Sequence, residues 1–93
     1  MNRNDLILLL AKTYPGMFLR TTEEFDGSPN GIWTSSEDNL EGKNGLPLFD
    51  YWNQDTKELY YQMGVNKELV NLLDTHGWYC EHYDAGTIMI HKI

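Results

Sequence analysis

The fold is decided by residues 64–93, GVNKELVNLLDTHGWYCEHYDAGTIMIHKI, which predict one helix followed directly by one β-hairpin. Asn66 predicts the start of the helix, because its side-chain oxygen can accept hydrogen bonds from the free N–H groups of the first turn. Gly77 predicts its end, since glycine readily adopts the left-handed conformation that terminates helices. An apolar stripe at helical spacing lies between these two signals and predicts one buried face; its members are Leu69, Val70, Leu72, Leu73 and His76.

The turn of the hairpin decides which of its side chains share a face. Residues 83–87, YDAGT, favour a three-residue loop in which Gly86 takes a left-handed bulge position and Tyr83 pairs with Thr87. Because side chains alternate along a strand, this register puts two sets on opposite faces. The set expected in the core is Trp78, Cys80, His82, Ile88 and Ile90, and the other set is Tyr79, Glu81, Tyr83, Met89 and His91. The alternative register would bring Cys80, His82 and His91 onto one face.

The N-terminal segment predicts a second helix, which is capped by Asn4 and ended by the Pro-Gly pair at residues 15–16. The body of this helix, residues 6–14, is apolar nearly all round. Such a helix either packs across the sheet or is shared with a partner in a dimer.

The rest of the chain predicts short strands, at residues 17–22, 32–34, 45–52 and 58–63. The last two would form a second hairpin around a turn at residues 53–57, and a helix over residues 56–63 is the rival interpretation. Hairpins pair antiparallel, and each helix has an apolar face to bury. The expected fold is therefore α+β, a single domain over residues 1–93 with a mainly antiparallel sheet of about four to six strands and two helices packed on one face.

Composition excludes several classes of function. The chain has 93 residues and a formal net charge of −7, from 14 acidic against 7 basic residues, and it has no Lys/Arg cluster. We therefore expect no direct binding to nucleic-acid phosphates. The single cysteine, Cys80, excludes an internal disulfide and suits a reducing compartment. The apolar run at residues 6–11 is too short to span a membrane, so we expect a cytoplasmic protein with no membrane partner.

The binding residues are predicted from acids and aromatics. Six acidic residues and no Lys or Arg lie between Thr21 and Gly42, in a segment whose Gly, Asn and Pro content indicates loops. Three Trp and six Tyr are more aromatic area than so small a core requires. Acids beside exposed aromatics suit a partner protein with a basic surface. The predicted partner-binding residues are Glu23, Glu24, Asp26, Trp33, Glu37, Asp38, Glu41, Tyr51 and Trp52.

Other classes of function remain as alternatives. No phosphate-binding glycine loop, nucleophile elbow or His-Glu metal motif occurs, so we expect no catalytic residue, no metal and no cofactor. The first alternative is a small enzyme or metal-binding protein that uses Cys80, His82 and His91. The second is a self-associating structural protein that forms a homodimer through its N-terminal helix. A sharper form of the binding hypothesis is DNA mimicry, in which rows of carboxylates stand where phosphates would.

Three short stretches carry a resemblance to a known group of proteins: residues 45–51 (GLPLFDY), 76–79 (HGWY) and 83–89 (YDAGTIM). In these stretches the chain resembles small accessory proteins encoded by tailed bacteriophages and prophages. The resemblance implies a protein made in the cytoplasm of a bacterial host, in a class that includes many inhibitors of host enzymes and defence systems. It transfers no functional residue to this chain.

Overall fold

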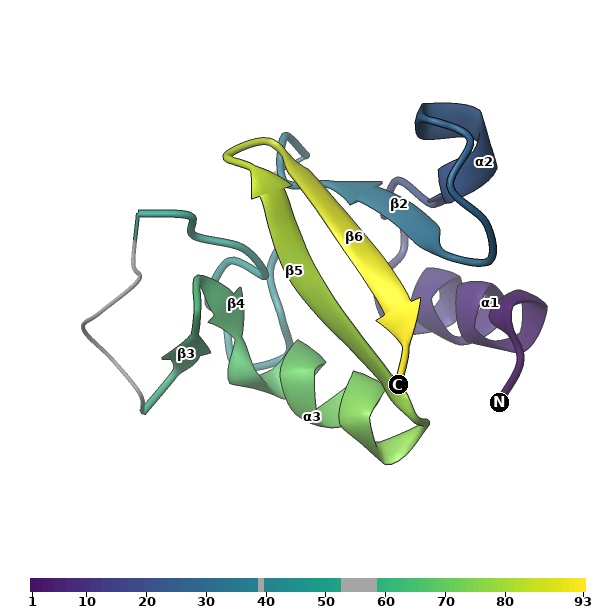
Figure 1. Cartoon of the computed structure of the whole chain (residues 1–93). Helices are drawn as coiled ribbons and strands as arrows, with labels where there is room; N and C mark the ends of the chain where they lie inside the picture. Colours follow the sequence, from purple (N-terminus) through teal and green to yellow (C-terminus); the bar gives the residue numbers. More distant parts are fainter. Residues whose placement is uncertain (39, 53–58) are drawn as a thin grey trace.

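The computed structural model describes residues 1–38, 40–52 and 59–93 and shows an α+β fold (Figure 1). The elements in chain order are α1 (Arg3–Thr13), β1 (Arg20–Thr21), α2 (Thr22–Phe25), β2 (Ile32–Ser35), β3 (Tyr61–Gln62), β4 (Val65–Asn66), α3 (Lys67–Thr75), β5 (Trp78–Asp84) and β6 (Thr87–Lys92). The main sheet has four antiparallel strands in the order β1-β2-β6-β5, and β3 and β4 form a small second sheet. The predicted fold class is confirmed. No helix in the described ranges has the length and apolar character needed to cross a bilayer.

The helix predicted after Asn66 is confirmed as α3. The Asn66 side chain accepts a hydrogen bond from the Glu68 N–H at 2.9 Å, and Gly77 lies just beyond the helix with a φ of 81°. Leu69 and Leu73 are fully buried, so the apolar stripe faces the core as expected. Local signals suffice here, because cap, stripe and stop all lie within the helix and its flanks.

The register of the β5–β6 hairpin is confirmed, whereas the predicted turn is wrong. Cys80 pairs with Ile90 and His82 with Ile88, but Asp84 rather than Tyr83 pairs with Thr87. The ladder has an irregularity between His82 and Asp84, and Gly86 is not among the residues with positive φ.

Contacts with the end of β2 explain this difference at the tip. The Gly86 N–H donates to the Asp84 carboxylate at 3.0 Å. Ser36 donates its N–H to the Gly86 carbonyl at 3.2 Å and its hydroxyl to the Ala85 carbonyl at 2.9 Å. The tip is therefore held both by its own Asp84 and by Ser36, which lies far from it in sequence.

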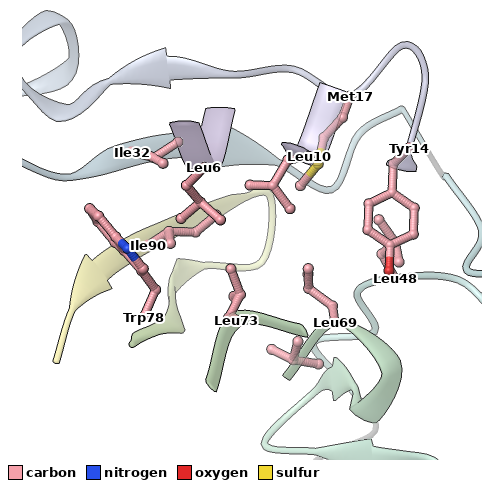
Figure 2. Close-up of a cluster of buried hydrophobic side chains, with 11 residues drawn as sticks. Leu6, Leu10, Tyr14, Met17, Ile32, Leu48, Leu69, Leu73, Trp78 and Ile90 are labelled. Carbon is pink, nitrogen blue, oxygen red and sulfur yellow. The ribbon is translucent and has the colours of Figure 1, made fainter. Parts of the chain in front are cut away.

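Both long helices pack on one face of the main sheet, which we call the inner face (Figures 1 and 2). The core combines side chains of α1, α3 and the sheet, and its fully buried members include Leu6, Leu10, Ile32, Leu69, Leu73 and Ile90. Trp78 closes one end of this cluster in Figure 2 and donates its ring N–H to the Met1 carbonyl at 3.0 Å. The short α2 lies on the other side of β2, above it in Figure 1.

The prediction that Asn4 caps α1 is wrong, because Asn2 is the cap. Its side chain accepts from the Asp5 N–H at 2.8 Å, so Arg3 joins the first turn. From there Arg3 donates to the Gly31 carbonyl at 3.1 Å, a long-range contact that the sequence does not reveal. Leu8 is 69% exposed on the far side of the helix, while the opposite side packs across the sheet.

The middle of the chain departs most from the predicted strands. The strand at residues 32–34 is confirmed as β2, but the one at 17–22 is reduced to two residues because Thr22 begins α2. Residues 45–52 form no regular strand and contribute only isolated bridges, Pro47 with Glu41 and Phe49 with Val65.

The predicted second hairpin is also wrong in its pairing. β3 pairs with β4 around Met63 and Gly64, which have φ of 51° and 77°, instead of pairing with residues 45–52. Two consecutive residues with positive φ form the compact turn that matches strand twist. Residues 53–58, which hold the predicted turn and the start of the rival helix, lie outside the described residues.

Candidate partner-binding site

The sheet face opposite α1 and α3, which we call the outer face, carries an aromatic layer. Trp33, Met89 and Glu81 are paired across β2, β6 and β5 and therefore project to this face together. The Phe25 ring of α2 lies 5.0 Å from the Trp33 ring and 5.1 Å from the Tyr83 ring, centroid to centroid. Met89, which lies between Trp33 and Glu81 in the sheet, is only 6% exposed. The outer face is thus partly covered by α2 and open elsewhere.

A cleft of about 410 Å³ lies where β2 ends beside the hairpin tip; we call it the acid–aromatic cleft. It is lined by Phe18, Trp33, Ser35, Glu37, Asp38, Gly86 and Thr87. The Phe18 and Trp33 rings meet edge to face, with centroids 5.0 Å apart at 71°. Three residues predicted from the sequence, Trp33, Glu37 and Asp38, are brought together here.

The backbone positions the two carboxylates of the cleft. The Glu37 N–H donates to the Ser35 hydroxyl at 3.0 Å, and the hydrogen bonds of Ser36 to the hairpin tip fix the chain just before it. Glu37 and Asp38 are both exposed, and neither forms an ion pair with any residue of the described segments. The cleft therefore presents two negative charges that are available to a partner.

This chemistry suits a basic side chain. An aromatic ring face attracts a cation, and a guanidinium can at the same time form hydrogen bonds to carboxylates. The protein already contains one such contact, since the guanidinium of Arg20 lies 5.6 Å from the centre of the Phe18 ring. A Lys or Arg side chain of a partner that reached Trp33 would meet Glu37 and Asp38 at the rim.

Two of the acids at α2 and its C-terminal flank, Glu23 and Asp26, are engaged in contacts within the fold. Glu23 forms an ion pair with Arg3 at 2.7 Å and accepts from the Asn30 N–H at 3.0 Å. The bond from Asn30, followed by the bond from Arg3, lowers the pKa of Glu23 to about 2. Hydrogen bonds from Ser28 likewise lower the pKa of Asp26. Glu24 lies 4.0 Å from the Arg20 Nε, and both side chains are largely exposed.

The remaining predicted residues lie away from the cleft. Glu41 forms an isolated antiparallel β-bridge with Pro47. The rings of Tyr51 and Trp52 pack edge to face, with centroids 5.0 Å apart. Tyr51 also lies 5.2 Å from the His82 ring, beside a hollow along β5. The six predicted acids thus divide among α2 and its flank, the end of β2 and the bridge at Glu41, and this division gives the DNA-mimicry hypothesis little support.

Phe18, Phe25 and Tyr83 are parts of the site that the sequence prediction missed. Phe18 and Phe25 flank the acidic residues Glu23 and Glu24, which was a usable signal. Tyr83 was expected on the same hairpin face as Tyr79 and Glu81, but its contact with Phe25 of α2 was not predictable, because the two residues are far apart in sequence.

The grouping required by the enzyme or metal alternative is not formed. Cys80 and His82 project to the inner face, whereas His91 projects to the outer face, where it lies 3.8 Å from Glu81. Within the described part of the chain no three His, Cys, Asp or Glu side chains are placed to hold a metal ion. Burial, with a smaller contribution from Glu81, raises the pKa of the Cys80 thiol to about 12, so this thiol is a poor nucleophile.

Comparison of the chain with protein-family models, curated proteins and solved structures found no match. Function is therefore inferred from the chemistry of the site, since a fold class alone does not specify one. That chemistry is anionic and aromatic, and it lies on a sheet face that the two long helices leave uncovered.

Proposed function

We propose that this protein is a non-enzymatic binding protein of the bacterial cytoplasm that docks on a basic surface of another protein. The observation that carries the proposal is the acid–aromatic cleft, in which Trp33, Glu37 and Asp38 line one hollow on the outer face. A Lys or Arg side chain of the partner enters this cleft, stacks on Trp33 and pairs with the two carboxylates.

Charge over the whole molecule supports this mode of binding. The net charge of −7 attracts a basic partner over long range and raises its rate of association, and salt screens that attraction. Tyr83, which is 62% exposed, extends the contact area next to the cleft. Aromatic anchors surrounded by charge are typical of the residues that dominate binding energy in protein interfaces.

The resemblance to accessory proteins of tailed phages and prophages suggests which partner to look for. That class includes many inhibitors of host enzymes and defence systems. We therefore propose a host protein as the partner and inhibition of its activity as the outcome of docking.

The test is recovery of a partner from bacterial lysate at low salt, followed by affinity measurements with the purified partner. The double variant Glu37→Gln/Asp38→Asn should bind about tenfold more weakly, since two charge-assisted contacts are lost. Its control is Asn71→Lys/Thr75→Lys, which changes the net charge equally but on the exposed side of α3.

The control should weaken binding much less than the cleft variant, and raised salt should narrow the difference between them. Equal affinities of the cleft variant and the unaltered protein would contradict the proposal. So would a partner whose binding is insensitive to salt.

A further inference from the structure

β5 is an edge strand of unusual length for so small a sheet. It spans seven residues, Trp78–Asp84, and the strand order β1-β2-β6-β5 leaves its second edge without a neighbouring strand among the described residues (Figure 1). Proteins commonly protect such edges with Pro or Lys or by covering them, because an open edge can pair with another chain. The sequence WYCEHYD contains neither Pro nor Lys.

The hydrogen-bond pattern shows which groups face the open edge. The Ile93 N–H donates to the Gly77 carbonyl at 2.9 Å, in line with the β5–β6 register. Bonded positions alternate in an antiparallel pair, so Tyr79 and Glu81 direct their N–H and C=O groups to β6. Cys80 and His82 direct theirs outward, and no residue in the described ranges bonds to those backbone groups.

A groove runs along this edge. Two hollows, of about 590 Å³ and about 200 Å³, share Met63, Tyr79 and Cys80 in their walls. Each hollow touches consecutive residues of β5, whose side chains alternate between the two faces. The space therefore opens along the edge of the strand rather than on either face, and we call it the edge groove.

The wall opposite β5 exposes large apolar side chains. Trp52 is 81% exposed and Met63 is 68% exposed, although both line the hollows. Met63 has a φ of 51° in the turn between β3 and β4, where Asn or Gly would be favoured. At that position the chain instead presents a flexible apolar side chain that can adapt to a ligand.

The acidic residues around the groove favour a basic segment as its occupant. Asp74 and Glu81 line the groove, and no Lys or Arg of the described residues lies in its walls. A second copy of this chain would bring a net charge of −7 toward the same acidic edge, which disfavours self-pairing. A basic segment is complementary to it.

We propose that the edge groove binds an extended segment of a partner protein, which adds to the sheet as a strand beside β5. Backbone bonds to Cys80 and His82 hold the segment, and its side chains alternate between an apolar set against Trp52 and Met63 and a basic set beside Glu81. This site is separate from the acid–aromatic cleft, and it stands even if the cleft has no partner.

Amide hydrogen exchange by NMR tests the proposal, with the acetylated peptide Lys-Val-Lys-Val-Lys-Val-Lys as the probe. In the free protein the amides of Cys80 and His82 should exchange rapidly, while those of Tyr79 and Glu81 are protected. Millimolar peptide should slow exchange at Cys80 and His82. A peptide N-methylated at the amides that face β5 should bind about fivefold more weakly for each hydrogen bond removed.

A variant separates this site from the cleft. Met63→Asn suits the turn, so the protein should stay folded, yet it should reduce the protection that the peptide gives to the Cys80 and His82 amides. Glu37→Gln/Asp38→Asn removes charge from the cleft, which can also attract this basic peptide, but saturating peptide should still protect the two amides as it does in the unaltered protein. Unchanged exchange at Cys80 and His82 with peptide present would overturn the proposal, as would equal binding of the N-methylated peptide. Protection of both amides in the free protein, with light scattering showing a dimer, would overturn it in favour of a second copy.

Discussion

Asn66 is fully buried, and its side chain serves two parts of the chain at once. Its oxygen caps α3 and also accepts from the Asn44 side chain at 3.0 Å. Its amide donates back to Asn44 at 3.0 Å and to the carbonyls of Leu46 and Pro47 at 3.3 Å. The capping half of this role was predicted from sequence. The other half was not, because a loop more than twenty residues away supplies the partners.

We predict that Asn66→Ala lowers the free energy of unfolding by about 2–4 kcal/mol, the sum of a lost cap and buried groups left without a partner. Urea denaturation measures the change. Asn44→Ala keeps the cap and should cost about 1 kcal/mol, and the exposed Asn71→Ala should stay within about 0.5 kcal/mol. Equal losses for Asn66→Ala and Asn71→Ala would contradict the assigned role.

Glu68 joins the same loop to α1. Its carboxylate accepts from the Tyr14 hydroxyl at 2.7 Å and from the N–H groups of Lys43 and Asn44 at 2.9 and 3.1 Å. Burial raises the pKa of Glu68, but these hydrogen bonds outweigh it and the pKa lies below its ordinary value. Its contribution to stability is therefore present at neutral pH and is lost as the pH falls through the folded-state pKa.

At the scale of elements, the hairpin tip shows how local and distant contacts compete. Residues 83–87 predict a bulge with Gly86 in the left-handed region, but Ser36 binds the tip and another conformation wins. The inner and outer faces of the hairpin were nevertheless predicted correctly, because the apolar alternation of β5 and β6 sets the register independently of the turn.

We predict that Gly86→Ala changes stability by no more than about 0.5 kcal/mol, because Gly86 does not use the left-handed region. The added Cβ would lie 3.3 Å from the exposed Glu37 side chain, which can move. Gly77→Ala should cost about 1–2 kcal/mol, since Gly77 has a φ of 81°. Thermal unfolding measures the stability of both variants. If Gly86→Ala lost more stability than Gly77→Ala, the result would support the bulge predicted from sequence and contradict the observed turn.

Over the whole molecule, the parts predicted from sequence are those whose signals are local. The α+β class follows from residues 64–93, and Trp33, Glu37 and Asp38 were identified by residue type. Strand order was not predictable, because β2 pairs with β6 between residues as far apart in sequence as Ile32 and Ile90. The cleft was not predictable either, because it is the strand order that brings Phe18 and the hairpin tip together beside β2.

The Cys80 thiol makes stability depend on pH. Its folded pKa of about 12 lies above the value of about 8.5 expected in the unfolded chain. Above about pH 8.5 the unfolded chain loses the thiol proton, whereas the folded protein keeps it. The free energy of unfolding is therefore unaffected by this thiol below about pH 8.5 and falls as the pH rises toward the folded pKa. We predict that raising the pH from about 7 to about 9.5 destabilises the protein by about 1 kcal/mol more than it destabilises Cys80→Ala. Equal losses in urea denaturation would contradict this.

The pairing of Ile32 with Ile90 also has a kinetic consequence. α3, β5 and β6 are contiguous in sequence, so they can form early with little loop entropy lost. β2 must then close a loop that spans most of the chain before the sheet is complete. We therefore expect β2 to join the sheet after the β5–β6 hairpin has formed, and until then β6 is a second open edge, exposed to the same strand addition that we propose for β5.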